Sequence, residues 1–168
     1  DFGAEEMAVF ERRQINTDDI ERVPDGKTFF WRGRYDFDLN TAHTLDTQLN
    51  VFADFRPKLS EESRRARMVF LGNIQPDLQR EVREQCTGAS LAGLDSMNLW
   101  IDIAHESLVR TISMVDCVIL NDGEVRQLTD EPNLVRAARA SLRASLGERH
   151  DGPEEAIAPW ARGERVEV

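Results

Sequence analysis

The chain has 168 residues, of which 40% are hydrophobic and 31% charged, a balance typical of a globular domain rather than of a disordered segment. Its formal net charge of −10 argues against non-specific binding to nucleic acid or to an anionic membrane surface, because both are polyanions. Every apolar run is far shorter than the roughly 20 residues that a membrane-spanning helix needs, so we expect no such helix.

In chain order, the first predicted element is an amphipathic helix over Asp1–Arg13. The chain begins with Asp rather than Met, so we expect the natural start to lie upstream. Two segments of period two follow, from Phe29 to Phe37 and from Thr44 to Phe52, and they predict two antiparallel strands with one covered and one solvated face.

Three short apolar runs after Pro57 predict a second sheet. The runs are Ala66–Ile74, Ala89–Met97 and Asp116–Leu120. Helical patterns separate and follow them, beginning at Pro76, at Ile101 (to Val115), near Gly123 and near Asn133. Strand and helix repeated in this order, with strands that are apolar on both faces, indicate an α/β fold with a parallel sheet. The segment from Gly147 to Val168 has no period, and we expect a disordered tail.

Polar residues follow each apolar run at the point where the strand should end. Asn73 follows the first, Asp95 and Asn98 the second, and Asn121 and Glu124 the third. Ligands bind outside the carboxyl ends of strands in an open parallel sheet, and this edge suits phosphate with magnesium. Helix capping is the alternative. It is the better interpretation of Asn73, whereas Asp95 and Asn98 suit both interpretations equally.

The two cysteines, Cys86 and Cys117, form no CxxC pair and no metal-like cluster with the histidines. We expect both to be reduced and at or near the core, which favours a cytoplasmic setting.

Several stretches resemble the ribokinase-like (PfkB) family of carbohydrate kinases. They are DFGAEE at the start, GKTFFWRGRYDFDLNTAHTLDTQLNVFADFRPKL, LGNIQPDLQ, LDSMNLWI and VILNDGEVRQLTDEPNLVRAARA, and together they cover nearly all of residues 1–140. The N-x-x-E element, here Asn121 to Glu124, is a family signature for placing magnesium and phosphate. With this resemblance added, Asn121 and Glu124 favour a ligand role.

The resemblance implies a three-layer α/β/α sandwich with a small antiparallel β lid, in which residues 27–52 are the lid and 66–140 the sheet core. It implies ATP-dependent phosphorylation of a sugar hydroxyl, with ATP and Mg²⁺ as cofactors, a sugar or nucleoside as substrate, and a homodimer contact through the lid. Asn121, Glu124, Asp95 and Asn98 would lie near the nucleotide, and Glu124 would hold Mg²⁺ through water. Thr28, Arg32 and Gln48 of the lid would face the sugar.

Two family motifs are missing from these 168 residues. The early glycine pair does not occur, and neither does the Gly-Ala-Gly-Asp stretch that supplies the anion hole and the catalytic base. The resemblance ends at Ala140, so that residues 141–168 lie outside it. We therefore expect a chain that carries part of a sugar kinase and is inactive alone. The alternative is a non-catalytic binding or dimerisation module derived from a truncated kinase.

Overall fold

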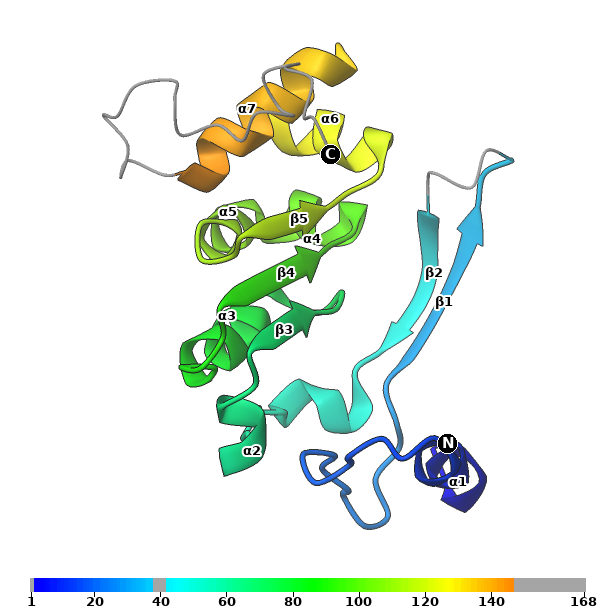
Figure 1. Cartoon of the computed structure of the whole chain (residues 1–168). Helices are drawn as coiled ribbons and strands as arrows, with labels where there is room; N and C mark the ends of the chain where they lie inside the picture. Colours follow the sequence, from blue (N-terminus) through cyan, green and yellow to red (C-terminus); the bar gives the residue numbers. More distant parts are fainter. Residues whose placement is uncertain (1, 38–41, 147–168) are drawn as a thin grey trace.

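The computed structural model describes residues 2–37 and 42–146, which fold into a mixed α/β structure (Figure 1). A two-stranded antiparallel sheet, β1-β2, lies beside a three-stranded parallel sheet of order β3-β4-β5. The predicted α/β class and the predicted division into a small antiparallel sheet and a parallel sheet are confirmed at this level.

Helix α1 spans Ala4–Arg12 and confirms the predicted N-terminal helix, although it buries no side chain. The Glu6 carboxylate accepts a hydrogen bond from the Gly3 N–H at 2.7 Å and so stabilises the first turn. The short α-helix α2, over Glu61–Arg64, was not predicted. The side chain of Ser60, its N-cap, accepts a hydrogen bond from the Ser63 N–H. The backbone N–H of Ser60 donates to the Asp19 carboxylate at 2.6 Å.

The hairpin consists of β1 (Phe30–Tyr35) and β2 (Ala42–Gln48), paired from Phe30↔Gln48 to Tyr35↔Ala42. The prediction that the second strand runs to Phe52 is wrong, because the chain forms a short 3-10 helix, η1 (Asn50–Asp54), after β2. Asn50 has a φ of 50° and donates from Nδ2 to the Thr28 carbonyl at 2.9 Å. This side-chain bond and turn end the ladder where periodicity alone continued it.

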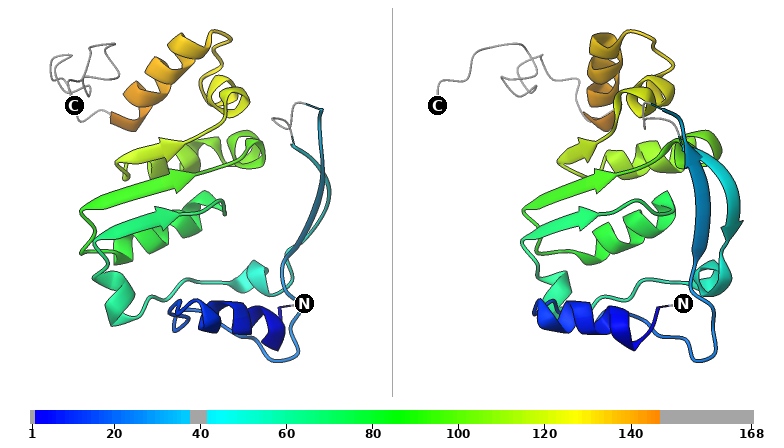
Figure 2. Two further views of the ribbon diagram at one scale, coloured as in Figure 1. Left: turned by 45° about the vertical axis from the view of Figure 1, so that its right-hand side comes forward. Right: turned by 90° about the vertical axis from the view of Figure 1, so that its right-hand side faces the viewer.

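The prediction that one face of the hairpin is covered is also wrong, because neither strand contains a buried side chain. The pairing shifts between Arg32 and Gly33. The indole ring of Trp31 lies over Gly33, where an added Cβ would lie 2.2 Å from the ring. The hairpin stands beside the parallel sheet rather than on top of it, and the described residues provide no layer that covers either of its faces (Figure 2).

The parallel sheet consists of β3 (Met68–Leu71), β4 (Leu91–Asp95) and β5 (Cys117–Ile119). Helix α3 (Pro76–Gln85) connects the first two strands, and Pro76 occupies its first turn as predicted. The single predicted helix from Ile101 to Val115 is instead two, α4 (Asn98–Ile103) and α5 (His105–Ile112), separated at Ala104. Ala104 has a φ of −139°, which is incompatible with a continuous helix.

The core lies between the sheet and the helices on one of its faces. Its buried cluster contains Leu71, Leu94, Ile101, Leu108, Ile112 and Leu128. The neighbouring residues of β3 and β5 on this face, Val69 and Val118, pack against the cluster. Transfer of such side chains from water contributes about 1.5–3 kcal/mol each, so this face supplies most of the folding energy of the sheet.

The opposite face of the sheet is exposed. Met68 is 70% exposed, Phe70 56% and Ile119 57%. Helices α3, α4 and α5 all lie behind the sheet in Figure 1, so the described residues provide one helical layer and not the second layer of the expected sandwich. Cys86 is buried as predicted, but the prediction for Cys117 is wrong because Cys117 lies on this exposed face.

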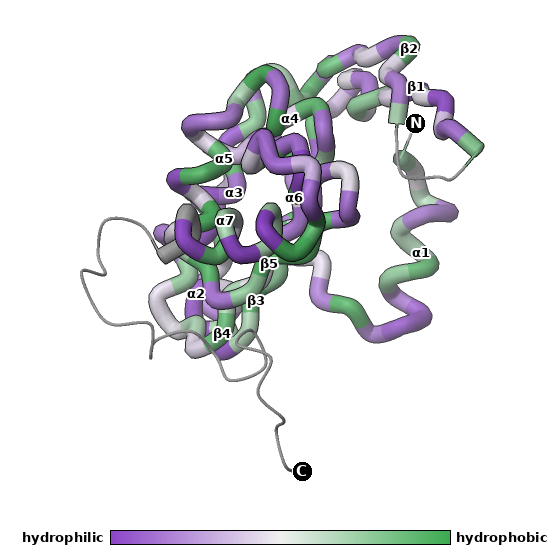
Figure 3. Tube along the Cα trace, turned by 90° about the horizontal axis from the view of Figure 1, so that it is seen from above, coloured by the Kyte–Doolittle hydropathy of each residue, from purple (hydrophilic) through white to green (hydrophobic). Residues whose placement is uncertain are grey.

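Helices α6 (Asp122–Thr129) and α7 (Leu134–Leu146) pack against each other beyond β5. Seen from above, apolar and polar positions alternate along these helices (Figure 3). The predicted disordered tail, 147–168, lies outside the described residues. Within the described ranges, no helix is both long enough and apolar enough to cross a membrane.

Candidate functional site

The carboxyl ends of all three parallel strands point toward the hairpin (Figures 1 and 2). A hydrogen bond connects the two parts at this edge, from Asn98 Nδ2 at the start of α4 to the carbonyl of Ala42 at the start of β2, at 2.9 Å. Asp95, Asn98, Asn121 and Glu124 therefore lie on the sheet edge that the hairpin flanks, as predicted from the strand order.

Asn121 and Glu124 form a reciprocal capping box at the start of α6. The Asn121 side-chain oxygen accepts from the Glu124 N–H at 2.8 Å, and Glu124 Oε2 accepts from the Asn121 N–H at 2.9 Å. The capping interpretation of this element is thus confirmed as local structure. The cap uses only one carboxylate oxygen, and Glu124 Oε1 accepts no hydrogen bond from the part of the chain that the structure describes.

Electrostatics distinguish Glu124 from an ordinary capping carboxylate. Burial raises its pKa, the bond from the Asn121 backbone lowers it, and the nearby charge of Asp95 raises it again. Burial also raises the pKa of Asp95, against the opposing effect of backbone hydrogen bonds from Asp95 itself and from Asn73. Two desolvated carboxylates that repel each other are the arrangement in which a cation would be stabilising.

Three buried oxygens near the ends of β3 and β4 have no hydrogen-bond partner among the described residues. They are Asp95 Oδ1, Ser96 Oγ and Gln79 Oε1. The Gln79 side chain is 1% exposed, and its amide nitrogen donates to the carbonyls of Leu71, Gly72 and Asp95 at 3.0–3.1 Å. Buried oxygens without partners are rare in folded proteins and mark places where water or an ion completes the site.

Sequence reasoning missed Gln79 and Ser96. Gln79 lies next to Leu78 in α3, and both residues are buried, but a glutamine at this position carries no pattern that would select it. Ser96 follows Asp95 directly at the strand end, but a serine there is so common in turns that the pattern does not select it.

Asn73 does not cap a helix, contrary to the preferred prediction. Gln75 occupies the N-cap of α3, and the Asn73 side-chain oxygen instead accepts a hydrogen bond from Trp100 Nε1 at 2.9 Å. This bond connects the loop after β3 to α4, so Asn73 fixes the spacing of the sheet edge.

The chemistry of the donors at this edge fits Mg²⁺, which prefers carboxylate oxygens and retains several water molecules. Asp95 Oδ1 and Glu124 Oε1 each lack a hydrogen-bond partner among the described residues. Within residues 2–37 and 42–146, no group of three or more His, Cys, Asp or Glu side chains is arranged to hold a metal. A magnesium ion here would therefore be held partly by water and by the ligand.

The three predicted sugar-facing residues do not lie together at this edge. Thr28 and Gln48 line a pocket of about 530 Å³ beside α1 at the base of the hairpin, together with Phe2 and Phe30. The Thr28 hydroxyl accepts from the Phe2 N–H at 3.1 Å, and Gln48 Nε2 donates to Asp46 at 3.1 Å. Arg32 lies farther along β1, is exposed and does not line this pocket. A role for these residues in binding sugar stays a prediction.

Comparison with known proteins adds no relative to this description. Neither a scan against protein-family models nor a search of curated proteins finds a match to the chain.

Proposed function

We propose that this chain is part of a carbohydrate kinase of the ribokinase-like type, and that it supplies the edge at which Mg²⁺ and the phosphates of ATP are placed. The observation that carries the proposal is the unpartnered Asp95 Oδ1 beside the desolvated carboxylate of Glu124. The motif resemblance over residues 1–140 is an independent support.

In this proposal Asp95 and Glu124 hold Mg²⁺, Glu124 through a water molecule. The ion, when bound, neutralises the charge of the phosphoryl group that ATP transfers to a sugar hydroxyl. The capping bond to the Asn121 N–H fixes the Glu124 carboxylate, so that Oε1 is presented at the edge. The hairpin flanks this edge and would exclude water from the sugar, which limits hydrolysis of ATP.

The alternative function is a non-catalytic binding or dimerisation module. It is favoured by the exposed apolar face of the parallel sheet, where Met68, Phe70 and Ile119 are all more than half exposed. Large exposed apolar patches on soluble proteins usually mark interaction sites. The two functions differ in one measurable property, because only the kinase proposal requires magnesium at the sheet edge.

The experiment is a Mg²⁺ titration with and without ATP. Isothermal titration calorimetry measures the Mg²⁺ and ATP affinities, and the melting temperature is measured for the same proteins. We expect Mg²⁺-dependent ATP binding by the parent chain and a loss of about 10- to 100-fold in Mg²⁺ affinity for Glu124→Gln. The matched control is Asp122→Asn. It removes a carboxylate from the same helical turn, but this carboxylate forms an ion pair with Arg126. Its Mg²⁺ affinity should equal that of the parent.

If Glu124→Gln lowers the melting temperature but leaves the Mg²⁺ dependence unchanged, Glu124 is only a cap and the kinase proposal fails. If the parent binds neither Mg²⁺ nor ATP, the non-catalytic function is the better one.

A further inference from the structure

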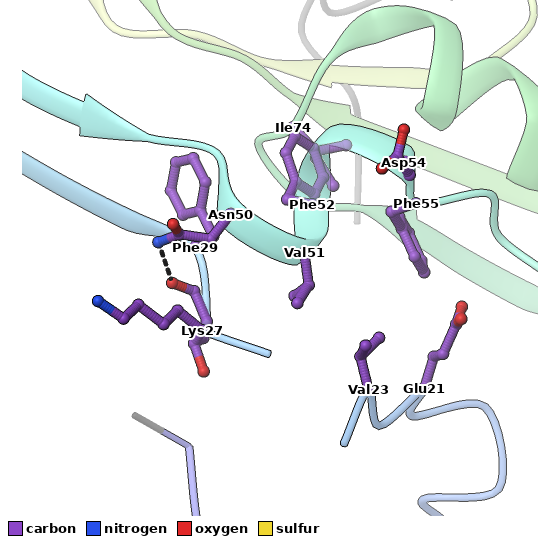
Figure 4. Close-up of a pocket in the computed structure, with 11 residues that line it drawn as sticks. Glu21, Val23, Lys27, Phe29, Asn50, Val51, Phe52, Asp54, Phe55 and Ile74 are labelled. Atoms are coloured by element: carbon purple, nitrogen blue, oxygen red, sulfur yellow. Dashed lines mark hydrogen bonds between the residues drawn. The ribbon is translucent and has the colours of Figure 1, made fainter. Parts of the chain in front are cut away.

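A second pocket lies away from the carboxylate edge, at the base of the hairpin. It has a volume of about 590 Å³, within the range of small-molecule sites, and is formed by the 21–29 segment, η1 and Ile74 (Figure 4). None of the residues that line it belongs to the Asp95–Glu124 site.

Hydrogen bonds hold the walls of this pocket in place. The Asn50 amide donates to the Thr28 carbonyl at 2.9 Å, as drawn in Figure 4, and the Val51 N–H donates to the Lys27 carbonyl at 3.2 Å. Gly26 permits a close approach, because a Cβ there would lie 2.4 Å from Val51 Cγ1. The pocket is therefore a built feature of the chain and not a gap between loosely joined segments.

Aromatic rings form much of the wall. Phe29 and Phe52 meet edge to face with their centroids 5.4 Å apart, and Phe52 and Phe55 are stacked at 6.2 Å. Phe29 is 43% exposed and Val23 49% exposed, so the wall presents apolar area to solvent. A flat apolar ligand would cover this area and gain ring–ring contacts.

The charged groups of the pocket are separated. Figure 4 shows Glu21 and Asp54 at one end, with the ring of Phe55 between them, and Lys27 at the other end. Neither acidic residue forms an ion pair with a described residue. Two unpaired carboxylates beside an aromatic face are the recognition elements for an organic cation, which can also contact the ring face.

We propose that this pocket binds a small aromatic amine. Its ring would contact Phe52 and Phe55, and its ammonium group would lie at the end of the pocket that carries Glu21 and Asp54. The net charge of −10 favours the approach of a cation over that of an anion.

The probe is 2-phenylethylamine, and the matched ligand is 3-phenylpropionate, which has the same ring and the opposite charge. Methyl resonances of Val23, Val51 and Ile74 report binding by NMR, because all three side chains line the pocket. We expect saturable shifts of these methyl groups with the amine and binding weaker by at least about tenfold with the carboxylate. Because charge attraction contributes, the amine affinity should fall as salt is raised.

The variant Glu21→Gln/Asp54→Asn should reduce amine affinity on the order of tenfold and leave the weak carboxylate binding unchanged or stronger. The control Glu11→Gln removes an exposed carboxylate from α1, outside the pocket, and should bind as the parent does. Equal binding of the two ligands would overturn the proposal, as would affinity that does not depend on salt. Methyl shifts that depend on the protein concentration and not on the amine concentration would assign the pocket to a second copy of the chain. That result would also overturn the proposal.

Discussion

Burial raises the pKa of Asp95, so its ionised form is less favourable in the folded chain than in the unfolded chain. Below its ordinary value of 3.8, Asp95 is protonated in both states. As the pH rises past 3.8, the unfolded chain releases this proton first, and the free energy of unfolding falls until the pH exceeds the raised pKa. The contribution of this residue to stability is therefore lost as the pH rises.

We predict that Asp95→Asn becomes more stable relative to the parent as the pH rises from about 3 to about 7, when Mg²⁺ is absent. The amide cannot ionise, so the desolvation cost disappears. Urea unfolding at a series of pH values measures the difference. Added Mg²⁺ should stabilise the parent and not the variant, and a variant that is stabilised equally would contradict the assignment of Asp95 to the metal.

The pKa of Asp77 is shifted in the opposite direction to that of Asp95, so Asp77 serves as a control. The Ser107 hydroxyl, which lies 2.6 Å from the Asp77 carboxylate, and the Arg80 guanidinium lower its pKa. Its stabilising contribution is present above its ordinary value of 3.8 and is lost as the pH falls through the lowered pKa. Asp77→Asn should therefore be less stable than the parent near neutral pH, with a difference that shrinks on acidification. A difference that grew in acid would show that the Ser107 contact is not charge-dependent.

At the scale of the elements, Gln79 joins α3 to the ends of two strands. Its amide satisfies carbonyls of β3, of the following loop and of β4. We predict that Gln79→Ala lowers the free energy of unfolding by about 1–3 kcal/mol, because buried carbonyls lose their donor. Chemical denaturation measures this change.

The control for that prediction is Gln127→Ala on α6, where the side chain donates to the exposed Asp102. This change should stay within about 0.5 kcal/mol of the parent. Equal effects of the two substitutions would mean that the amide of Gln79 has no structural role.

The sequence predicts the order of elements well and their boundaries less well. Apolar runs and Pro76 are local signals, and they locate β3, β4, β5 and α3 correctly. The end of β2 depends on the bond from Asn50 to Thr28, 22 residues away, and no periodicity contains that information. The break at Ala104 is missed for a related reason, since the apolar pattern continues across it.

The candidate site, like the fold, is predicted from local signals in part only. Strand order alone places Asp95 and Glu124 at one edge, because parallel strands share a carboxyl end. The desolvation of both carboxylates depends on how deeply they are packed, which the pattern does not contain. An apolar strand such as Met68–Leu71 has the same sequence pattern whether one face or both faces are covered, so the pattern of the strand does not show which face is exposed.

At the scale of the whole molecule, the exposed sheet face should cause self-association. Within residues 2–37 and 42–146, both β3 and β5 are also edge strands, which adds unpaired backbone groups. We predict that Met68→Lys/Ile119→Lys shifts the chain toward the monomer in light scattering, with little loss of stability because both side chains are more than half exposed. Val135→Lys, an exposed apolar position on α7, is the control and should not change the association. A parent that stays monomeric at high concentration would contradict this prediction.

We also predict that the 168-residue chain consumes no ATP in response to sugars above background. No Gly-Ala-Gly-Asp stretch occurs in it, and loss of a general base alone typically costs about 10²- to 10⁴-fold in rate. A coupled assay with a panel of sugars and nucleosides tests this. Robust turnover would mean that another carboxylate of the chain acts as the base.

The weak packing of the hairpin affects how tightly the sheet edge can bind a ligand. Because its strands bury no side chain, little packing energy distinguishes an arrangement in which it closes over the sheet edge from one in which it swings away. A ligand that binds only the closed arrangement has an apparent dissociation constant equal to its intrinsic value divided by the fraction of closed molecules. A substitution that strengthened the contact between Asn98 and Ala42 would thus tighten binding without touching the ligand.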